Sequence, residues 1–184
     1  VTDAKGATAE QTITVTLTGT NDAPTLAGNV SGSVTEDAVA TTATGTLTST
    51  DVDTGDTATY SIADKSGTYG SITIDGTSGA WTYTLDNSLA STDAIAADAT
   101  AADTFTATVT DAKGATAEQT ITVTLTGAND APTLAGDVSG SVTEDAVATT
   151  ATGTLTSSDI DTGDTAAYSI ADTSGTYGSI TIDG

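Results

Sequence analysis

Residues 103–127 read DTFTATVTDAKGATAEQTITVTLTG, and this stretch decides the fold class. Apolar residues occupy every second position from Phe105 to Val109 and again from Ile121 to Leu125, with threonine between them. A period of two is typical of strands that bury one face and expose the other, and threonine favours the exposed face of a strand. Turn-forming Asp and Gly separate the two runs. The stretch therefore predicts two consecutive β-strands.

The same alternation recurs along the preceding residues. It is present at Trp81–Leu85, Ile72–Ile74 and Tyr60–Ile62, and weaker strands are marked by Val34 and Leu47. About seven strands in roughly a hundred residues predict an all-β fold, an antiparallel sandwich of immunoglobulin-like type. Trp81, Tyr83 and Phe105 lie on alternating positions and are expected in its core. The alanine-rich connection Leu89–Ala102 is expected to contain a helical turn or two.

The chain is a tandem repeat. The sequence from Val1 to Gly76 recurs from Val109 to Gly184 with six substitutions, a period of 108 residues, which matches one small domain. Both prolines lie in the phrase NDAPTLAG, which is interpreted as the linker. The predicted organisation is therefore a C-terminal strand segment of one repeat (1–20), a complete sandwich (21–128) and the N-terminal part of the next repeat (129–184), within a longer array.

The composition excludes several classes of function. The net charge is −22, with 3 Lys+Arg against 25 Asp+Glu, and His and Cys are absent. Without His or Cys there is no Ser-His-Asp or Cys-His nucleophile pair and no zinc site built on those ligands, so an enzyme is not expected. With three lysines and no arginine, nucleic acid is not an expected partner. No apolar run is long enough to insert in a membrane.

Acidic residues cluster after one predicted strand, in Asp51-Val52-Asp53-Thr54-Gly55-Asp56. Alternating carboxylates in a glycine-containing turn place several oxygens around one point, which suits a hard cation such as Ca²⁺. An EF-hand is excluded, because Ile62 stands where its twelfth-position Glu is required. The Asp-Thr-Gly triplet is also found in aspartic proteases, but the neighbouring acids disfavour that chemistry. A solvated acidic surface remains the alternative.

Several phrases together resemble a known family. TSTDVDTGDTATYSI (48–62), LTGTNDAP (17–24), LTGANDAP (125–132) and VTED (34–37) resemble cadherin repeats. DGTSGAWTYTLDN (75–87) and DTFTATVTDAKGATA (103–117) resemble, more specifically, the VCBS repeats of giant RTX-type bacterial surface adhesins. The linker departs from the cadherin pattern, since Asn-Asp-Ala replaces Asn-Asp-Asn. The resemblance covers the whole unit in order.

This resemblance implies Ca²⁺ at the junctions between units. At the first junction, which lacks the counterpart of Asp86 and is expected to bind more weakly, the implied ligands are Asp3, Asn21, Asp22, Glu36, Asp37, Asp51, Asp53 and Asp56. At the second junction, they are Asp86, Asp111, Asn129, Asp130, Glu144, Asp145, Asp159, Asp161 and Asp164.

The function implied by the resemblance is structural. The chain is expected to be a calcium-stiffened extender of an extracellular bacterial adhesin, exported by a type I system and supporting adhesion or biofilm reach. Its partners would be neighbouring repeats, with other cells or surfaces contacted through domains elsewhere. Two alternatives stay open at this point, a glycan- or surface-ligand-binding module and a filament unit assembled by strand exchange.

Overall fold

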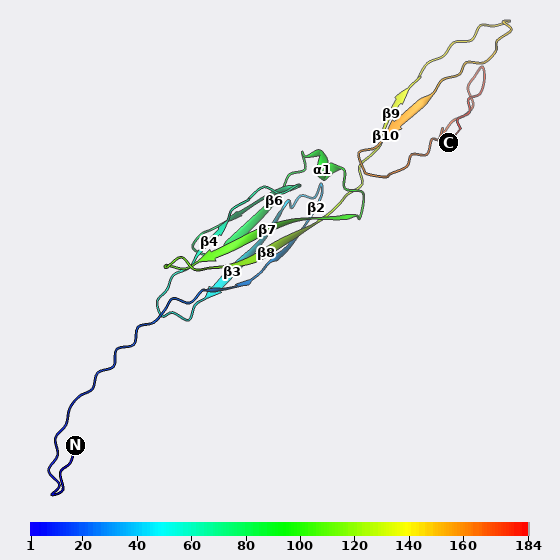
Figure 1. Ribbon diagram of the computed structural model, residues 1–184. Helices are drawn as coiled ribbons and strands as arrows, with labels where there is room; N and C mark the ends of the chain where they lie inside the picture. Colours follow the sequence, from blue (N-terminus) through cyan, green and yellow to red (C-terminus); the bar gives the residue numbers. More distant parts are fainter. Residues whose placement is uncertain (184) are drawn as a thin grey trace.

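The computed structural model describes residues 1–183, and its middle part is a sandwich of two four-stranded sheets (Figure 1). One sheet has the order β1-β3-β6-β5, formed by Thr25–Gly28, Thr42–Thr50, Ala80–Leu85 and Gly70–Ile74. The other has the order β2-β8-β7-β4, formed by Ser31–Thr35, Thr116–Thr126, Thr100–Thr110 and Thr59–Ile62. The predicted all-β sandwich is confirmed.

The topology differs from the expectation in one pair of strands. β2 runs parallel to β8, with Ser31 opposite Thr122 and Thr35 opposite Thr126, whereas the other neighbours in both sheets are antiparallel. The chain leaves the first sheet after β1 at Gly28, which has a φ of 111° that glycine adopts without steric cost, and joins the second sheet as β2. This switch adds a strand, β1, that lies inside the phrase interpreted as a linker.

The core is made by the alternating residues that the pattern predicted. Trp81, Tyr83 and Phe105 are 1%, 0% and 4% exposed, which confirms their core role. The Trp81 indole donates a hydrogen bond to the backbone oxygen of Asn29 at 2.8 Å. A Cβ on Gly45 would lie 2.5 Å from the Trp81 ring, so the strand opposite the indole requires glycine there.

One acid lies inside the sandwich and is fully hydrogen bonded. Asp103 is 3% exposed and accepts bonds from the backbone N–H groups of Thr68 and Tyr69 and from the Tyr83 hydroxyl, at 2.8, 3.1 and 2.8 Å. Burial and the Asp103 carboxylate raise the pKa of Tyr83. Asp103 thus fixes the loop after β4, and both of its carboxylate oxygens accept hydrogen bonds.

The connection between the sheets is shorter than expected. Its helix, α1, is a single turn at Ala90–Asp93, and the connection ends at residue 99 because β7 begins at Thr100. The turn is anchored by buried Thr92 and by the Ser91 hydroxyl, which donates to the backbone oxygen of Thr68 at 2.9 Å. No helix among the described residues has the length and apolar character needed to cross a membrane.

Two segments extend from opposite ends of the sandwich (Figure 1). The N-terminal segment turns back at a bridge between Thr2 and Thr8 and then runs extended to the sandwich. The C-terminal segment contains an antiparallel pair, β9 at Thr133–Gly136 and β10 at Leu155–Ser158, whose register reproduces that of β1 with β3. The limits of the repeats at residues 20 and 128 stay predictions.

Candidate metal centre between two units

Glu36 lies where the complete unit meets the following segment. It directly follows β2, and because β2 is parallel to β8, it lies beside the chain that leaves β8. The Glu36 N–H donates to the Thr126 oxygen at 2.9 Å, and its Oε2 accepts from the Ala128 N–H at 3.0 Å. The side chain is 2% exposed. Strand direction therefore buries a carboxylate against the linker.

The following unit contributes acids from one turn. Carboxylate oxygens of Asp159, Asp161 and Asp164 lie within 4.8 Å of one another. Asp161 is 4% exposed, and its Oδ2 accepts from the Asp130 N–H at 2.9 Å, which ties the turn to the linker. The turn is closed by a bond from the Asp164 N–H to the Asp161 oxygen and by Gly163 at φ 86°. The DTGD turn (161–164), together with Asp159 just before it, thus gathers three carboxylates.

The connection around α1 forms a third side of the junction. The Thr162 N–H donates to the Ala94 oxygen at 3.2 Å, a backbone bond between the two units. Asp93, next to Ala94, repels the charges on both Glu36 and Asp130. Sequence reasoning missed Asp93, and the available signal was an acid within an alanine-rich connection. Three separate parts of the chain therefore meet at this point.

The electrostatics of the junction favour neutralisation. Burial, followed by the charges of Asp130, Asp37 and Asp93, raises the pKa of Glu36, although the bond from Ala128 opposes the rise. The pKa of Asp130 is also raised, first by burial and then by Asp37, Asp161, Asp93 and Asp159. The charged groups that act on these two carboxyls are all acidic. Such a group is stabilised by a bound cation.

The donor set fits calcium. Glu36 Oε1 and Asp161 Oδ1 are buried and have no hydrogen-bond partner among the described residues. The same is true of Asn87 Oδ1. A buried oxygen without a partner is costly unless a ligand satisfies it. The donors that meet here are oxygens, and Ca²⁺ binds six to eight oxygens in protein sites. The observation that supports a cation is therefore the pair of buried, unpaired carboxylate oxygens contributed by both units.

A second acidic group lies at the opposite end of the sandwich. Asp51, Asp56 and Asp111 place carboxylate oxygens within 4.8 Å of one another. The Asn21 amide donates to Asp111 at 2.8 Å and is the main cause that lowers the pKa of that carboxyl. The Ala112 N–H donates to Asp56 at 3.0 Å, and the Asp22 N–H to Asp53 at 2.9 Å. This group therefore belongs with the first linker.

These positions correct the grouping that the resemblance implied. Asp111 was expected beside Asn129, and Glu36 with Asp37 beside Asn21, but each lies at the other end. The reason is strand direction, because β8 has 11 residues, about 36 Å of extended chain, and separates Asp111 from the second linker. Parallel β2 likewise carries Glu36 away from Asn21.

Three other predicted ligands also lie away from the linkers beside which they were expected. Asp3 lies in the N-terminal hairpin, which Figure 1 shows extending away from the sandwich, and its carboxylate accepts from the N–H groups of Lys5 and Ala7. Glu144 and Asp145 lie in the long loop between β9 and β10, which Figure 1 shows extending away from the sandwich. Neither set is brought to the junction where it was expected.

Two predicted ligands lie at the second junction with local partners. Asp86 follows β6 on the α1 side, and the N–H and hydroxyl of Ser88 bond to its carboxylate and lower its pKa. The Asn129 amide donates to the backbone oxygen of Asp130 at 2.8 Å. Among the described residues, neither of them has a hydrogen bond to the buried carboxylates.

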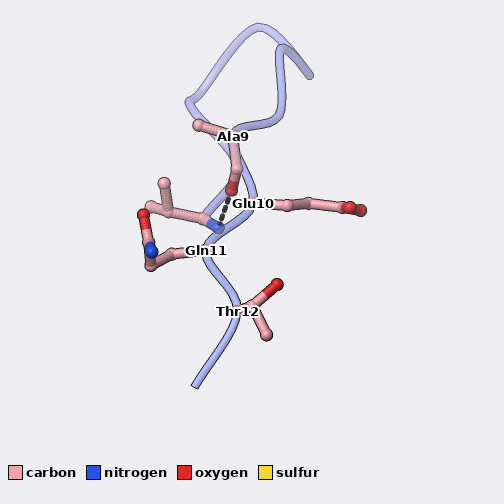
Figure 2. Close-up of a pocket in the computed structure, with 5 residues that line it drawn as sticks. Ala9, Glu10, Gln11 and Thr12 are labelled. Carbon is pink, nitrogen blue, oxygen red and sulfur yellow. Dashed lines mark hydrogen bonds between the residues drawn. The ribbon is translucent and has the colours of Figure 1, made fainter. Parts of the chain in front are cut away.

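The hollow in Figure 2 offers no catalytic arrangement. It lies in the N-terminal hairpin, has a volume of about 650 Å³, and is lined by Val1 and residues 9–12. The Val1 ammonium donates to the Ala9 oxygen at 2.7 Å, and Glu10 supplies the one carboxylate of the lining. A single carboxylate cannot act as a paired acid and base.

The fold and the acidic ends define a class, the all-β sandwich with groups of acidic residues at both ends. Residues 21–127, more than half of the chain, match the family model described as bacterial cadherin-like domain, and the chain belongs to this family. Domains of this kind are adhesion-type structural modules, are typically non-enzymatic and generally bind calcium. No curated protein is detectably similar to the chain.

Several solved structures are similar to part of the chain. Crystal structures of Drosophila N-cadherin EC1-3 and EC1-4 are 19% identical, cover 62% of this chain and 36% and 28% of their own, and each gives a TM-score of 0.39. A nucleoside hydrolase-related hypothetical protein from Saccharophagus degradans is 13% identical over 58% of this chain and 26% of its own, with a TM-score of 0.37. The chain spans about a third or less of each.

Proposed function

We propose that this chain is a segment of a calcium-stiffened stalk in an extracellular bacterial adhesin of the VCBS and RTX type. The observation that supports this function is that buried carboxylates of two consecutive units bond to the same linker, Glu36 to the Ala128 N–H and Asp161 to the Asp130 N–H. A site divided between units can couple ion binding to their relative orientation. A stalk needs that property, because its reach depends on stiffness.

The proposed ligands of the second junction are the acids that the structure brings there. They are Glu36, Asp37, Asp86, Asp93, Asn129, Asp130, Asp159, Asp161 and Asp164. Calcium would supply positive charge to groups that otherwise repel one another, and it would satisfy the two unpaired oxygens. At the first junction, Asn21, Asp22, Asp51, Asp53, Asp56 and Asp111 form the matching half that faces a preceding unit.

Calcium availability would make the stiffness depend on location. Extracellular calcium modules bind with dissociation constants of about 0.1 to 1 mM, well above cytosolic calcium. Within the cell the junction would therefore be empty and its acids mutually repelling, which suits export of an unfolded or pliable chain by a type I system. Outside, the array would stiffen and extend the adhesion or biofilm domains that it carries.

The aromatic residues do not favour the glycan-binding alternative. Trp81, Tyr83 and Phe105 are buried in the sandwich, and the Tyr60 hydroxyl bonds to Ser49 at 2.9 Å. Carbohydrate sites commonly present aromatic faces to solvent, and the complete unit holds these rings inside. A stalk is therefore the function that the geometry supports best.

The test compares two identical turns. Asp161→Asn changes the second junction, and Asp53→Asn makes the same change in the matching turn, which no folded unit precedes. Calorimetry should show calcium binding that Asp161→Asn weakens more than Asp53→Asn does. Small-angle X-ray scattering should show that calcium narrows the range of end-to-end lengths that the molecule adopts. Unchanged melting temperature and scattering after EDTA treatment of the wild type would rule out the stalk proposal.

A further inference from the structure

One asparagine of the complete unit lies in a sequence that asparagine-linked glycosylation uses. Asn29-Val30-Ser31 has the form Asn-x-Ser, in which the middle residue is not proline. The chain has three other asparagines, and each of them is followed two positions later by alanine or leucine. The motif is short, so the structure around Asn29 decides whether it can act as an acceptor of sugar.

Asn29 lies in the turn between β1 and β2, where its main chain and its side-chain oxygen are held. Its N–H donates to the Thr46 oxygen at 2.9 Å, and its backbone oxygen accepts from the Trp81 indole at 2.8 Å. Its side-chain oxygen accepts from the Ser31 N–H at 3.0 Å. Asn29 and Ser31 are both exposed, and within residues 1–183 neither the Asn29 amide nitrogen nor the Ser31 hydroxyl has a hydrogen-bond partner. Both functional groups of the motif are therefore accessible.

The next repeat shows that the turn does not need this nitrogen. Asp137 stands at the position of Asn29, one of the six differences between the two copies. Its N–H donates to the Thr154 oxygen at 2.9 Å, the counterpart of the bond from Asn29 to Thr46. A side chain without nitrogen therefore fits the same turn, so the amide nitrogen of Asn29 is not required for folding and is free for chemistry.

The turn lies on the flank of the sandwich and not at a junction. The Thr122 N–H donates to the Val30 oxygen at 2.9 Å, which places the turn beside the middle of β8. The acidic groups lie at the two ends of the sandwich instead. A group attached to Asn29 would therefore project sideways from the unit and leave the carboxylates of both junctions uncovered.

We propose that Asn29 is a site of N-glycosylation, with a donor sugar that is activated by a diphosphate on its anomeric carbon. In the transfer, the Asn29 amide nitrogen forms a bond to the anomeric carbon while the bond from that carbon to the diphosphate oxygen breaks. The amide gives one proton to a base of the transferase, and the diphosphate leaves with the electron pair of the broken bond. The product carries a bulky, hydrated group on the flank of the unit.

Peptide mapping by mass spectrometry tests this site on the protein isolated from the cells that make it. The peptide that contains Asn29 should carry an added mass, and fragmentation should place that mass on Asn29. Nucleotide-linked sugars and lipid-linked oligosaccharides share the diphosphate chemistry. Addition of a single hexose indicates the first donor, whereas addition of a whole oligosaccharide indicates the second.

Three variants made in the same cells separate the acceptor from its surroundings. Asn29→Asp keeps an oxygen for the Ser31 N–H, and Ser31→Ala keeps both Asn29 and that N–H donor, but each should abolish the addition. Asp137→Asn creates Asn-Val-Ser in the next repeat and should gain a second modified residue. The fluorescence of Trp81, whose indole bonds to Asn29, reports that the sandwich stays folded in each variant.

Three results would overturn the proposal. An unmodified Asn29 in the protein from its own cells would show that the motif is not used. An addition that persists in Ser31→Ala, or that lies on a threonine hydroxyl of the same peptide, would show a different chemistry. An Asp137→Asn variant without a second addition would show that Asn-Val-Ser is not what the transferase recognises. None of these results depends on calcium, so they leave the stalk proposal to its own test.

Discussion

Two glutamates at equivalent positions of the repeat, Glu36 and Glu144, show that the burial of this carboxylate depends on its surroundings. Glu36 and Glu144 have the same neighbours in sequence, but Glu36 is buried against the linker while Glu144 is exposed in a loop. The difference arises because β2 has β8 beside it and residues 139–143 have no such strand. The role of the carboxylate is therefore determined by the strand pairing that surrounds it.

The effect of Glu36→Gln on the melting temperature is expected to have opposite signs without and with calcium. In EDTA it should preserve or raise the melting temperature, because it removes a buried charge that neighbouring acids repel and keeps an oxygen for the Ala128 N–H. In calcium it should lower the melting temperature and weaken calcium binding on the order of tenfold, since a charged ligand is lost. Glu144→Gln is the control and should change neither. A drop of equal size in both conditions would contradict the assigned role.

The change in melting temperature on lowering the pH is expected to have opposite signs without and with calcium. The pKa values of Glu36 and Asp130 are raised above their ordinary 4.5 and 3.8, so the folded junction binds these protons more tightly than the unfolded chain does. That stabilisation is fully present below the ordinary pKa values and is lost as pH rises through the raised ones. In EDTA, the melting temperature should therefore rise as the pH is lowered from neutral toward the ordinary pKa of 4.5.

With calcium bound, lowering the pH over the same interval should lower the melting temperature, because protons compete with the ion for these oxygens. Asp75, Asp86 and Asp111, whose pKa values are lowered, oppose the trend only as the pH falls further, through their own pKa values. Parallel pH profiles with and without calcium would contradict the prediction.

At the scale of elements, the DTGD turn occurs once with and once without a folded unit before it. Ile160, directly before the second turn, is 47% exposed, and Val52, directly before the first turn, is 78% exposed. The Thr162 N–H bonds to Ala94, whereas Thr54 has no folded preceding unit to contact. The turn is thus built by its own sequence, and the preceding unit adds burial and one bond.

Thr162→Pro isolates that one bond. Position 162 is the second residue of a turn with glycine next at positive φ, a place that proline fits, so the turn should persist while its N–H donor disappears. We expect calcium binding at the second junction to weaken several-fold, because about 0.5 to 1.5 kcal/mol of hydrogen bonding is lost. Thr54→Pro is the matched control. Calorimetry that gives the same affinity for both variants would exclude a role for the Ala94 contact.

Much of the fold could be predicted from period-two alternation, because burial of every second residue follows from strand geometry. Trp81 and Phe105 were placed in the core on that basis. β1 was missed, since TLAG is too short to show alternation, and the parallel pairing of β2 with β8 leaves no local signature. The candidate ligands were identified as residue types, but Glu36 and Asp111 were assigned to the wrong ends. Which end a residue occupies depends on strand direction, which is a property of the topology.

At the scale of the whole molecule, charge dominates the response to ions. The net charge is −22, and acids gather at both ends of the sandwich. In EDTA, sodium chloride should raise the melting temperature by screening this repulsion, since the Debye length falls from about 30 Å at 0.01 M to about 8 Å at 0.15 M. In saturating calcium the rise should be smaller, because bound ions have already neutralised the junctions. Equal salt dependence in both conditions would count against calcium at these acids.

The parallel pairing of β2 with β8 also determines how the unit meets mechanical load. The chain enters the sandwich beside Asn21 and leaves it after β8 at the opposite end (Figure 1), so tension pulls β2 and β8 in opposite directions along their lengths. The hydrogen bonds between them are then loaded in shear and must fail together, whereas a hairpin pulled from one end would unzip bond by bond. A tether made of such units would hold its length under a brief pull and yield one unit at a time.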